Sequence, residues 1–379
     1  MIVQQRVLFL AIVSASLASQ SAVAGELIGK RVMPISDAVT LRGEGGANAK
    51  IHSIQWPASV KTIDGQWLWV QDDGGTAYPI VGGWVRGEDV VLVHEALDYY
   101  NSRLQQEAGV RGIYWLRGVC WENAREFDLA TKDYEQAVQQ DAQNPQARLG
   151  LARMLSRKEY NDEQFVEAWK LNRASPRLHV DWGQALEVAN MAGRAEAMYQ
   201  EAARLNPHWR TPPHALGKLA ASRGDFTTAL ENYAEAIRRD ASFHVAHRDR
   251  ASAWLAAKQG DASHLAVGSA RKACELCYFR EADSLAVLAE SHAALKQWPE
   301  ARRYQQMAVE YSPMPLKEKH KSRYVDYATK VALEDNLLAS GERTRDVELI
   351  PPDEMPRVKP PQPVVRLPLF LDRSSQSFE

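Results

Sequence analysis

Small and apolar residues recur along the middle of the chain at the spacing expected of packed helices. Five alanines mark the pattern, each followed by another alanine seven places later: Ala130, Ala195, Ala229, Ala266 and Ala301. In three of these stretches a tyrosine stands four places after the alanine. The alanines are 65, 34, 37 and 35 residues apart, the first interval being almost two units. This spacing predicts a helical repeat of about 34 residues.

One unit shows what each repeat contains. The stretch 224–237 predicts a turn followed by a helix with one apolar face. In the helix before it, Leu216-Gly217 and Ala220 occupy the positions that Trp182-Gly183 and Leu186 occupy one unit earlier. Small residues at these positions let two helices approach closely. We therefore expect each unit to supply two helices joined by a glycine-marked turn.

These positions resemble the tetratricopeptide repeat family over roughly residues 95–313. The matching residues are Gly118, Ala130, Tyr134 and Ala137; Gly183, Ala195, Tyr199, Ala202 and Pro207; Gly217, Gly224, Ala229, Tyr233 and Ala236; and Ala301, Ala308 and Pro313. The resemblance implies a mainly α protein, an α-solenoid of helical hairpins that binds a protein or peptide partner on its concave face. The array is expected to span 94–313, with a half repeat and five to six units.

The array is expected to depart from regular repeats in three places. Stepping back one unit from Ala130 leads to Ala96 and Tyr100, so the array opens with a half unit. Between Asn144 and Ser175 the small positions are assigned to Gln164 and Ala168, an irregular unit. The unit over 251–274 carries an insertion near 259–261.

The segment before the array has a different pattern. Short Val-, Ile-, Leu- and Trp-rich runs at 31–35, 38–41 and 66–70 are separated by Gly and Asp clusters, which predicts strands. The stretch 64–70 and the later Gly82-Gly83-Trp84-Val85 resemble bacterial SH3-like domains, which implies a small all-β barrel over 25–93. Because this module runs directly into the first helix at about residue 94, we expect a stiff junction.

The two ends of the chain are expected to differ from both domains. Arg6 precedes the apolar run 7–17, and Ala22-Val23-Ala24 suits a signal peptidase, so residues 1–24 are predicted to be a cleaved export signal. This predicts a periplasmic or secreted protein. A terminal helix is expected within 314–340. Residues 341–379 are expected to form an extended tail, because seven prolines lie between Pro351 and Pro368.

Composition narrows the function. The formal net charge is −2 and there is no long basic stripe, which argues against nucleic acid as the main partner. The apolar run near the N-terminus is too short for a stable membrane span.

With three cysteines the fold is not expected to rest on disulfides. Cys274 and Cys277 are assigned to core packing, with a labile disulfide and a metal half-site as the alternatives left open. His244 and His247 are assigned to helix packing or the surface, with no metal.

No motif for nucleophilic, phosphate-binding or zinc-dependent catalysis is recognised, so we expect no enzyme and no cofactor. Two surfaces compete as binding sites. On the β module, Trp67 and Trp69 share one strand face and, with Trp56 and Trp84, either offer an aromatic platform or cap the core. On the array, alignment of the first helices places six residues on or near the concave face: Trp115, Gln184, His214, Lys218, Arg248 and Ser252. Lys218 and Arg248 are candidates for holding a carboxylate.

The resulting hypothesis is an exported, non-catalytic scaffold that binds a protein or peptide partner through the concave face, with the SH3-like module as a second contact. The alternative is a peptidoglycan-binding module on the SH3-like domain, with the repeats as a spacer.

Overall fold

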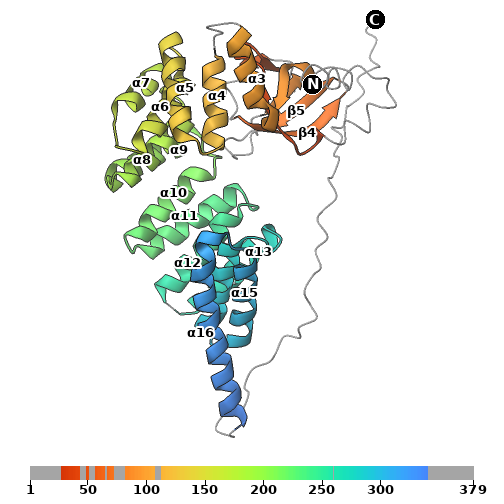
Figure 1. The fold of residues 1–379 in the computed structure, drawn as a ribbon. Helices are drawn as coiled ribbons and strands as arrows, with labels where there is room; N and C mark the ends of the chain where they lie inside the picture. Colours follow the sequence, from red (N-terminus) through yellow and green to blue (C-terminus); the bar gives the residue numbers. More distant parts are fainter. Residues whose placement is uncertain are drawn as a thin grey trace, which may run out of the picture.

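The computed structural model describes residues 27–42, 48–50, 56–64, 66–71, 82–106, 112–258 and 260–339. A β-sheet stands at one end of a winding row of helices, and a long helix stands at the other end (Figure 1). The expected signal peptide and the expected proline-rich tail lie outside the described residues.

The N-terminal module is a curled antiparallel sheet of seven strands, in the order β3-β2-β6-β5-β4-β1-β7. The strands are β1 Arg31–Pro34, β2 Thr40–Arg42, β3 Asn48–Lys50, β4 Ala58–Asp64, β5 Trp67–Gln71, β6 Gly82–Arg86 and β7 Val90–Leu92, with a 3-10 turn, η2, at Gly87–Asp89. The all-β prediction is confirmed. A closed barrel was expected, but β3 and β7 are both edges among the described strands, so the sheet is open there.

The rest of the described chain is helical. The helices are α3 Val93–Gln106, α4 Ile113–Asn123, α5 Phe127–Gln140, α6 Pro145–Ser156, α7 Glu163–Leu171, α8 Pro176–Val188, α9 Ala192–Leu205, α10 Thr211–Ser222, α11 Phe226–Arg239, α12 His244–Ala257, α13 Ala262–Leu276, α14 Ala282–Ala294, α15 Trp298–Tyr311 and α16 Met314–Ala339. The half unit is α3, six hairpins run from α4/α5 to α14/α15, and α16 follows them. The predicted α-solenoid of helical hairpins is confirmed.

Local sequence explains where several first helices begin. The Asn144 side chain accepts hydrogen bonds from the backbone N–H groups of Gln146 and Ala147, both at 3.0 Å. The Ser175 hydroxyl accepts one from the Leu178 N–H at 3.2 Å. A proline follows each of these caps, where its missing N–H costs nothing.

A glycine of the first helix packs against a tyrosine of the second in three of the regular hairpins. A Cβ added to Gly183 would lie 2.5 Å from the Tyr199 ring, and one added to Gly217 would lie 2.7 Å from the Tyr233 ring. Gly118 meets the Tyr134 ring in the same way at 2.9 Å. The three tyrosines therefore occupy equivalent interior positions. This confirms the alignment from which the repeat was predicted.

The remaining hairpins fill the tyrosine position differently. In α7 the core residue is Phe165, which is fully buried and stacks on Trp182 of α8 with centroids 5.6 Å apart. The predicted small position Gln164 is only half-buried, so a small residue was wrongly assigned there. Phe165 and Ala168 are three residues apart, as are Tyr134 and Ala137, and the matching first small position falls before α7, which has nine residues and begins at Glu163. Ala168 is buried as expected. In the last hairpin the position is taken by buried Gln305.

The turns between the two helices of a hairpin also differ from expectation. A left-handed residue was expected to be glycine, and in the fourth hairpin it is Gly224, with φ +79°. In other hairpins the same place holds Arg125, Asn190 and Lys296, with φ of 63°, 59° and 59°. The turn is therefore set by backbone hydrogen bonding at the helix end rather than by glycine, and the left-handed side chains carry some strain.

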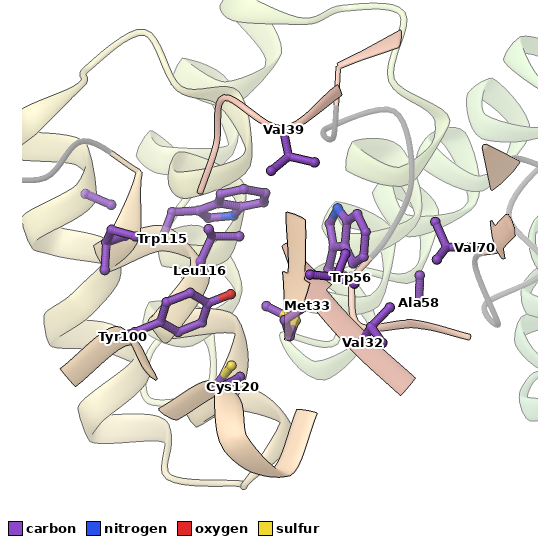
Figure 2. Packing of buried hydrophobic residues seen from close by; sticks show 14 of the residues in the cluster. Val32, Met33, Val39, Trp56, Ala58, Val70, Tyr100, Trp115, Leu116 and Cys120 are labelled. Atoms are coloured by element: carbon purple, nitrogen blue, oxygen red, sulfur yellow. The ribbon is translucent and has the colours of Figure 1, made fainter. Parts of the chain in front are cut away.

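The sheet and the first helices share one hydrophobic core (Figure 2). Met33 of β1 faces the helices, and Trp115 of α4 lies near Val39, which directly precedes β2. The Tyr100 hydroxyl of α3 donates a hydrogen bond of 2.5 Å to the backbone carbonyl of Pro34. The stiff junction that the sequence predicted is thus built from shared apolar packing.

The other end of the array is covered by α16. Tyr327 is buried with its ring 6.4 Å from that of Trp298, and Arg323 pairs with Glu290 of α14 at 3.2 Å. The Gln305 side-chain amide donates to the backbone carbonyl of His320 at 3.0 Å. One helix with a polar anchor therefore closes the last hairpin.

Candidate functional site

An open row of side chains runs across three consecutive first helices. Gln184, Lys218 and Ser252 each follow directly on a buried small residue of α8, α10 and α12, and all three are exposed. In the first two hairpins the same position holds Val119, which is half-buried, and Leu151, which is buried. The array is therefore closed at this position near the sheet and open along its middle. We call Gln184, Lys218 and Ser252 the open row.

Lys218 is the cation of the open row. No ion pair or hydrogen bond engages its ammonium within the described residues. It stands one helical turn after His214, whose imidazole is buried against the rings of Tyr233 and Phe243. An ammonium in this position is available to an acceptor on a bound chain.

A cluster of charged side chains lies one turn before the open row and ties α10, α12 and α14 together. The His214 Nε2 lies 2.8 Å from the Asp249 Oδ2. The Arg248 guanidinium donates to Asp249 at 2.9 Å and to Glu281 at 2.9 Å. Burial opposes ionisation of Asp249, but these bonds hold the pKa of its carboxyl below the ordinary value. The cluster fixes the relative position of three first helices.

A second cluster does the same between α4, α6 and α8. Arg153 donates to Glu122 at 2.6 Å and to Asp181 at 3.0 Å, and Arg177 donates to Asp181 at 2.7 Å. The Tyr134 hydroxyl donates to Glu122 at 2.7 Å. Burial would raise the pKa of Glu122, yet the Arg153 charge and these bonds hold it below the usual value. One charge cluster thus joins α8 to the first helices before it, and the other joins α10 to the first helices after it.

The structure separates the array residues that the sequence had grouped together. Gln184, Lys218 and Ser252 are exposed at equivalent positions. Trp115 is 5% exposed and belongs to the core shared with the sheet, so it cannot line an open face. His214 is buried, and the Arg248 side chain is 20% exposed and held by two carboxylates. The shared carboxylate site expected of Lys218 and Arg248 does not fit this geometry.

No role was predicted for Arg153 or Asp249, which are central to the two clusters. A signal was present, since residues of opposite charge occur on successive first helices, as with Glu122, Arg153 and Asp181. Their pairing could not be assigned without the hairpin geometry, because the partners of Arg153 are 28 and 31 residues away along the chain.

The tryptophans of the sheet divide between the core and the outer face. Leu68, Val70 and Val85 are buried, so Trp67 and Trp69 point to the opposite face, where they are half-buried. Trp84 lies across from Trp69 in β6, with ring centroids 5.4 Å apart. Trp56 is buried in the core. Both sequence alternatives therefore hold in part: one tryptophan is core, and three form an outer aromatic face.

Charged groups border this aromatic face. Arg42, exposed on β2, places its guanidinium 5.2 Å from the centroid of the Trp67 ring. Arg86 stands across from Trp67 and pairs with Glu88 at 2.5 Å. Guanidinium and indole together suit a ligand with both a flat apolar surface and an acceptor group.

The other candidate chemical groups are parts of the scaffold. Cys274 is buried, and burial raises the pKa of its thiol well above the ordinary value; Cys120 is raised to about 12 for the same reason. His247 is buried with its Nε2 3.2 Å from the Ala241 carbonyl, while His244 lies 3.8 Å from Glu281. Within the described ranges, no three His, Cys, Asp or Glu side chains gather as metal ligands.

None of the helices that the structure describes combines the length and apolar character needed to cross a bilayer.

Comparison with known proteins identifies the fold. No family model and no curated protein matches the sequence. Among solved structures, the APC/C hetero-tetramer Cut9–Hcn1 matches with a TM-score of 0.52 at 13% identity, over 62% of this chain and 46% of that chain. The type IV pilus biogenesis factor PilW matches with a TM-score of 0.48 at 19% identity, over 55% of this chain and 96% of that one.

PilF of Pseudomonas aeruginosa matches with a TM-score of 0.44 at 16% identity, over 63% of this chain and 99% of that one. This chain spans less than half of the Cut9–Hcn1 chain that it matches. The likeness to Cut9–Hcn1, with a TM-score of 0.52, shows a tetratricopeptide-type fold for the helical array.

Proposed function

We propose that this protein is an exported, non-catalytic adaptor that binds an extended segment of a protein partner along the open row. The observation that carries the proposal is the line of exposed polar side chains at Gln184, Lys218 and Ser252, one from each of three consecutive first helices. Such a line matches a peptide that needs hydrogen bonds at several points along its backbone. The solved structures support the repeat architecture on which this function depends.

The two charge clusters support the same function. They hold α4, α6 and α8 together on one side and α10, α12 and α14 on the other through bonds between partly buried groups. A surface held rigid before binding loses less conformational entropy when a ligand docks. Each cluster therefore limits the motion of the helices that it joins, with Gln184 in one group and Lys218 and Ser252 in the other.

Site-specific photocrosslinking in cells tests this proposal. A photoreactive phenylalanine at position 218 or 252 should give covalent adducts with one partner protein. The matched control is position 231 in α11, where Glu231 is exposed on a second helix. Equal adducts from 218 and 231, or none from 218 and 252, would contradict a site on the open row. Fractionation and N-terminal sequencing of the mature chain, with Gly25 expected first, test the export.

The outer aromatic face favours a second candidate, in which the N-terminal module is SH3-like and binds peptidoglycan while the repeats act as a spacer. The supporting observation is the set of half-buried Trp67, Trp69 and Trp84 beside Arg42, since indole faces bind sugar rings. Pelleting of the full mature chain with isolated peptidoglycan tests it. Binding that disappears in Trp67→Ala but persists in Lys218→Glu would favour wall binding; a chain that stays in the supernatant rejects it. The full chain is needed because the sheet shares its core with α3–α6.

A further inference from the structure

The outer face of α16 is a surface that the proposed function does not use. The helix packs on the last hairpin through Tyr327 and Val331, which are buried. Its opposite face is exposed at positions three and four residues apart, which fall on one side of a helix. These residues are Ser322, Val325, Thr329, Ala332 and Asn336. We call them the α16 seam.

The α16 seam consists of short side chains, of which Val325 and Ala332 are apolar. Val325 and, beside the seam, Leu333 are each 60% exposed. The Thr329 hydroxyl donates to the carbonyl of Val325 at 2.9 Å, so it needs no water to satisfy it. Short side chains on the seam allow two helix axes to approach closely. The α16 helix also continues past the hairpins it covers, at the end of the array opposite the sheet (Figure 1).

Charge along α16 changes sign from one half to the other. The first half carries Lys317, Lys319, Lys321 and Arg323 against Glu318 and, at its end, Asp326, and the second half carries Glu334 and Asp335 against Lys330. This order is the reverse of the one that a helix dipole favours. It is the order expected of a helix that meets a copy of itself running in the opposite direction, because each basic half then faces an acidic half.

We propose that α16 is a self-association surface, on which two copies of this chain pair through antiparallel α16 helices related by a two-fold axis. Placing Val325 opposite Thr329 of the second copy brings Ser322 opposite Ala332. In the same register Lys321 stands beside Asp335 of the second copy, and symmetry repeats the pair. The Lys319 stem covers Leu333 of the second copy. Lys321 pairs with Glu318 of its own helix at 2.7 Å, and Asp335 also has a contact within its own chain. An ammonium has three donors and a carboxylate accepts several hydrogen bonds, so both groups can keep these contacts in the pair.

Two features of this interface set its expected strength. It is one helix wide, which places it among the small interfaces of transient complexes. Asp326 lies near the two-fold axis and therefore faces Asp326 of the second copy. The repulsion between these two carboxylates opposes association. We therefore expect a dimer that forms at about micromolar concentrations and weakens as salt is added.

Sedimentation velocity of the full mature chain over about 1–200 µM tests the proposal. The parent protein should show a dimer fraction that rises with concentration. Lys321→Glu and Asp335→Lys should each weaken the dimer at least about tenfold, because each places like charges together. The double variant, which exchanges the two charges, should recover most of the loss. Asp326→Asn should tighten the dimer.

The control is Lys272→Glu, the same charge change at an exposed lysine of α13. It should leave the dimer unchanged, and circular dichroism confirms that each variant is folded. A parent chain that stays monomeric over the whole range would overturn the proposal, as would a double variant that remains as weak as the single ones. Deletion of residues 341–379 tests whether the chain's own C-terminal segment covers the seam in place of a second copy. A dimer that forms only after this deletion would mean that it does.

Discussion

The two ends of the array are covered in different ways. At the sheet end, a whole β module shares its apolar core with α3–α6, and the Tyr100 hydroxyl adds one buried hydrogen bond. At the other end a single helix, α16, is anchored by Tyr327 and by the bond from Gln305 to the His320 carbonyl. Terminal repeats expose an apolar surface that must be covered in any solenoid. The comparison shows that this chain covers one end by extending its core into a sheet and the other by one long helix that packs along α15 with both apolar and polar contacts.

The same interior position shows the contrast at the level of one residue. Tyr134, Tyr199 and Tyr233 fill it with an aromatic ring against glycine, which closes the hairpin on itself. Gln305 fills it with an amide that reaches out of the hairpin to the next element. A repeat position therefore serves internal packing in the body of the array and attachment at its end.

The largest expected difference between the ends comes from truncating their anchoring tyrosines. Tyr100→Ala should lower the free energy of unfolding by about 3–5 kcal/mol, because it removes a fully buried ring and leaves the Pro34 carbonyl without its donor. Tyr327→Ala should cost less, about 2–3 kcal/mol, because that ring lies at the edge of the core. Urea unfolding followed by tryptophan fluorescence measures both. Equal losses would mean that the two ends are equally tight.

Breaking the charge cluster near the sheet end should have the next largest effect. Arg153→Met should destabilise by about 2–4 kcal/mol at neutral pH, because it leaves Glu122 partly buried without its cation. The double variant Glu122→Gln/Arg153→Met should recover part of this loss. The folded pKa of Glu122 is below its ordinary 4.5, so its pairing stabilises the fold above about pH 4.5 and is lost as the pH falls through the folded value. The difference between Arg153→Met and the parent should therefore shrink in acid.

A methyl group added inside a hairpin tests the glycine–tyrosine contact. Gly183→Ala should cost about 1–3 kcal/mol, since its Cβ would lie 2.5 Å from the Tyr199 ring. The matched control is Gly268→Ala in α13, where nothing lies within 4 Å of the added Cβ. That change should stabilise the helix by about 0.5–1 kcal/mol. Thermal unfolding should show a lower midpoint for Gly183→Ala and a higher one for Gly268→Ala than for the parent. An unchanged midpoint for Gly183→Ala would show that the hairpin can relax around the ring.

The smallest expected effect is a pH dependence of the free energy of unfolding that comes from histidines in α12, α14 and α16. Burial lowers the pKa values of His247, His292 and His320, which lie in α12, α14 and α16. The unfolded chain binds protons to these histidines more readily, so stability is full above about pH 6.5 and falls as the pH drops toward the folded values. We expect about 1 kcal/mol to be lost between pH 7.5 and 5.5. Urea midpoints at both values measure the slope, which His292→Gln should reduce.

Much of the fold could be predicted from the sequence because its determinants are periodic. The Ala130 and Tyr134 spacing, repeated at Ala195 and Tyr199, requires helices that pack at fixed intervals. The second hairpin was misaligned because α7 is short and begins after the first small position of the pattern, so Gln164 was taken for that position although Phe165 and Ala168 are the buried residues. The turns were misassigned because backbone hydrogen bonds place Arg125 and Lys296 in the left-handed region without glycine. The residue types at these turns do not reveal the backbone hydrogen bonds that determine the turn.

The candidate site was only partly predictable. Helical spacing correctly placed Gln184 and Lys218 on first helices, but it could not separate them from His214 and Arg248 one turn away. The difference depends on carboxylates from the next hairpin, Asp249 and Glu281, which reach the two residues only in the folded array. Burial of Trp115 likewise depends on a sheet that lies outside the repeat.

The shared core of the sheet and α3–α6 joins the β module and the first hairpins into one unit of packing. The later hairpins have separate clusters of buried residues, so they can open without exposing that core. Native-state hydrogen exchange should therefore show the buried amides of the strands and of α3 exchanging together, apart from those of α14–α16.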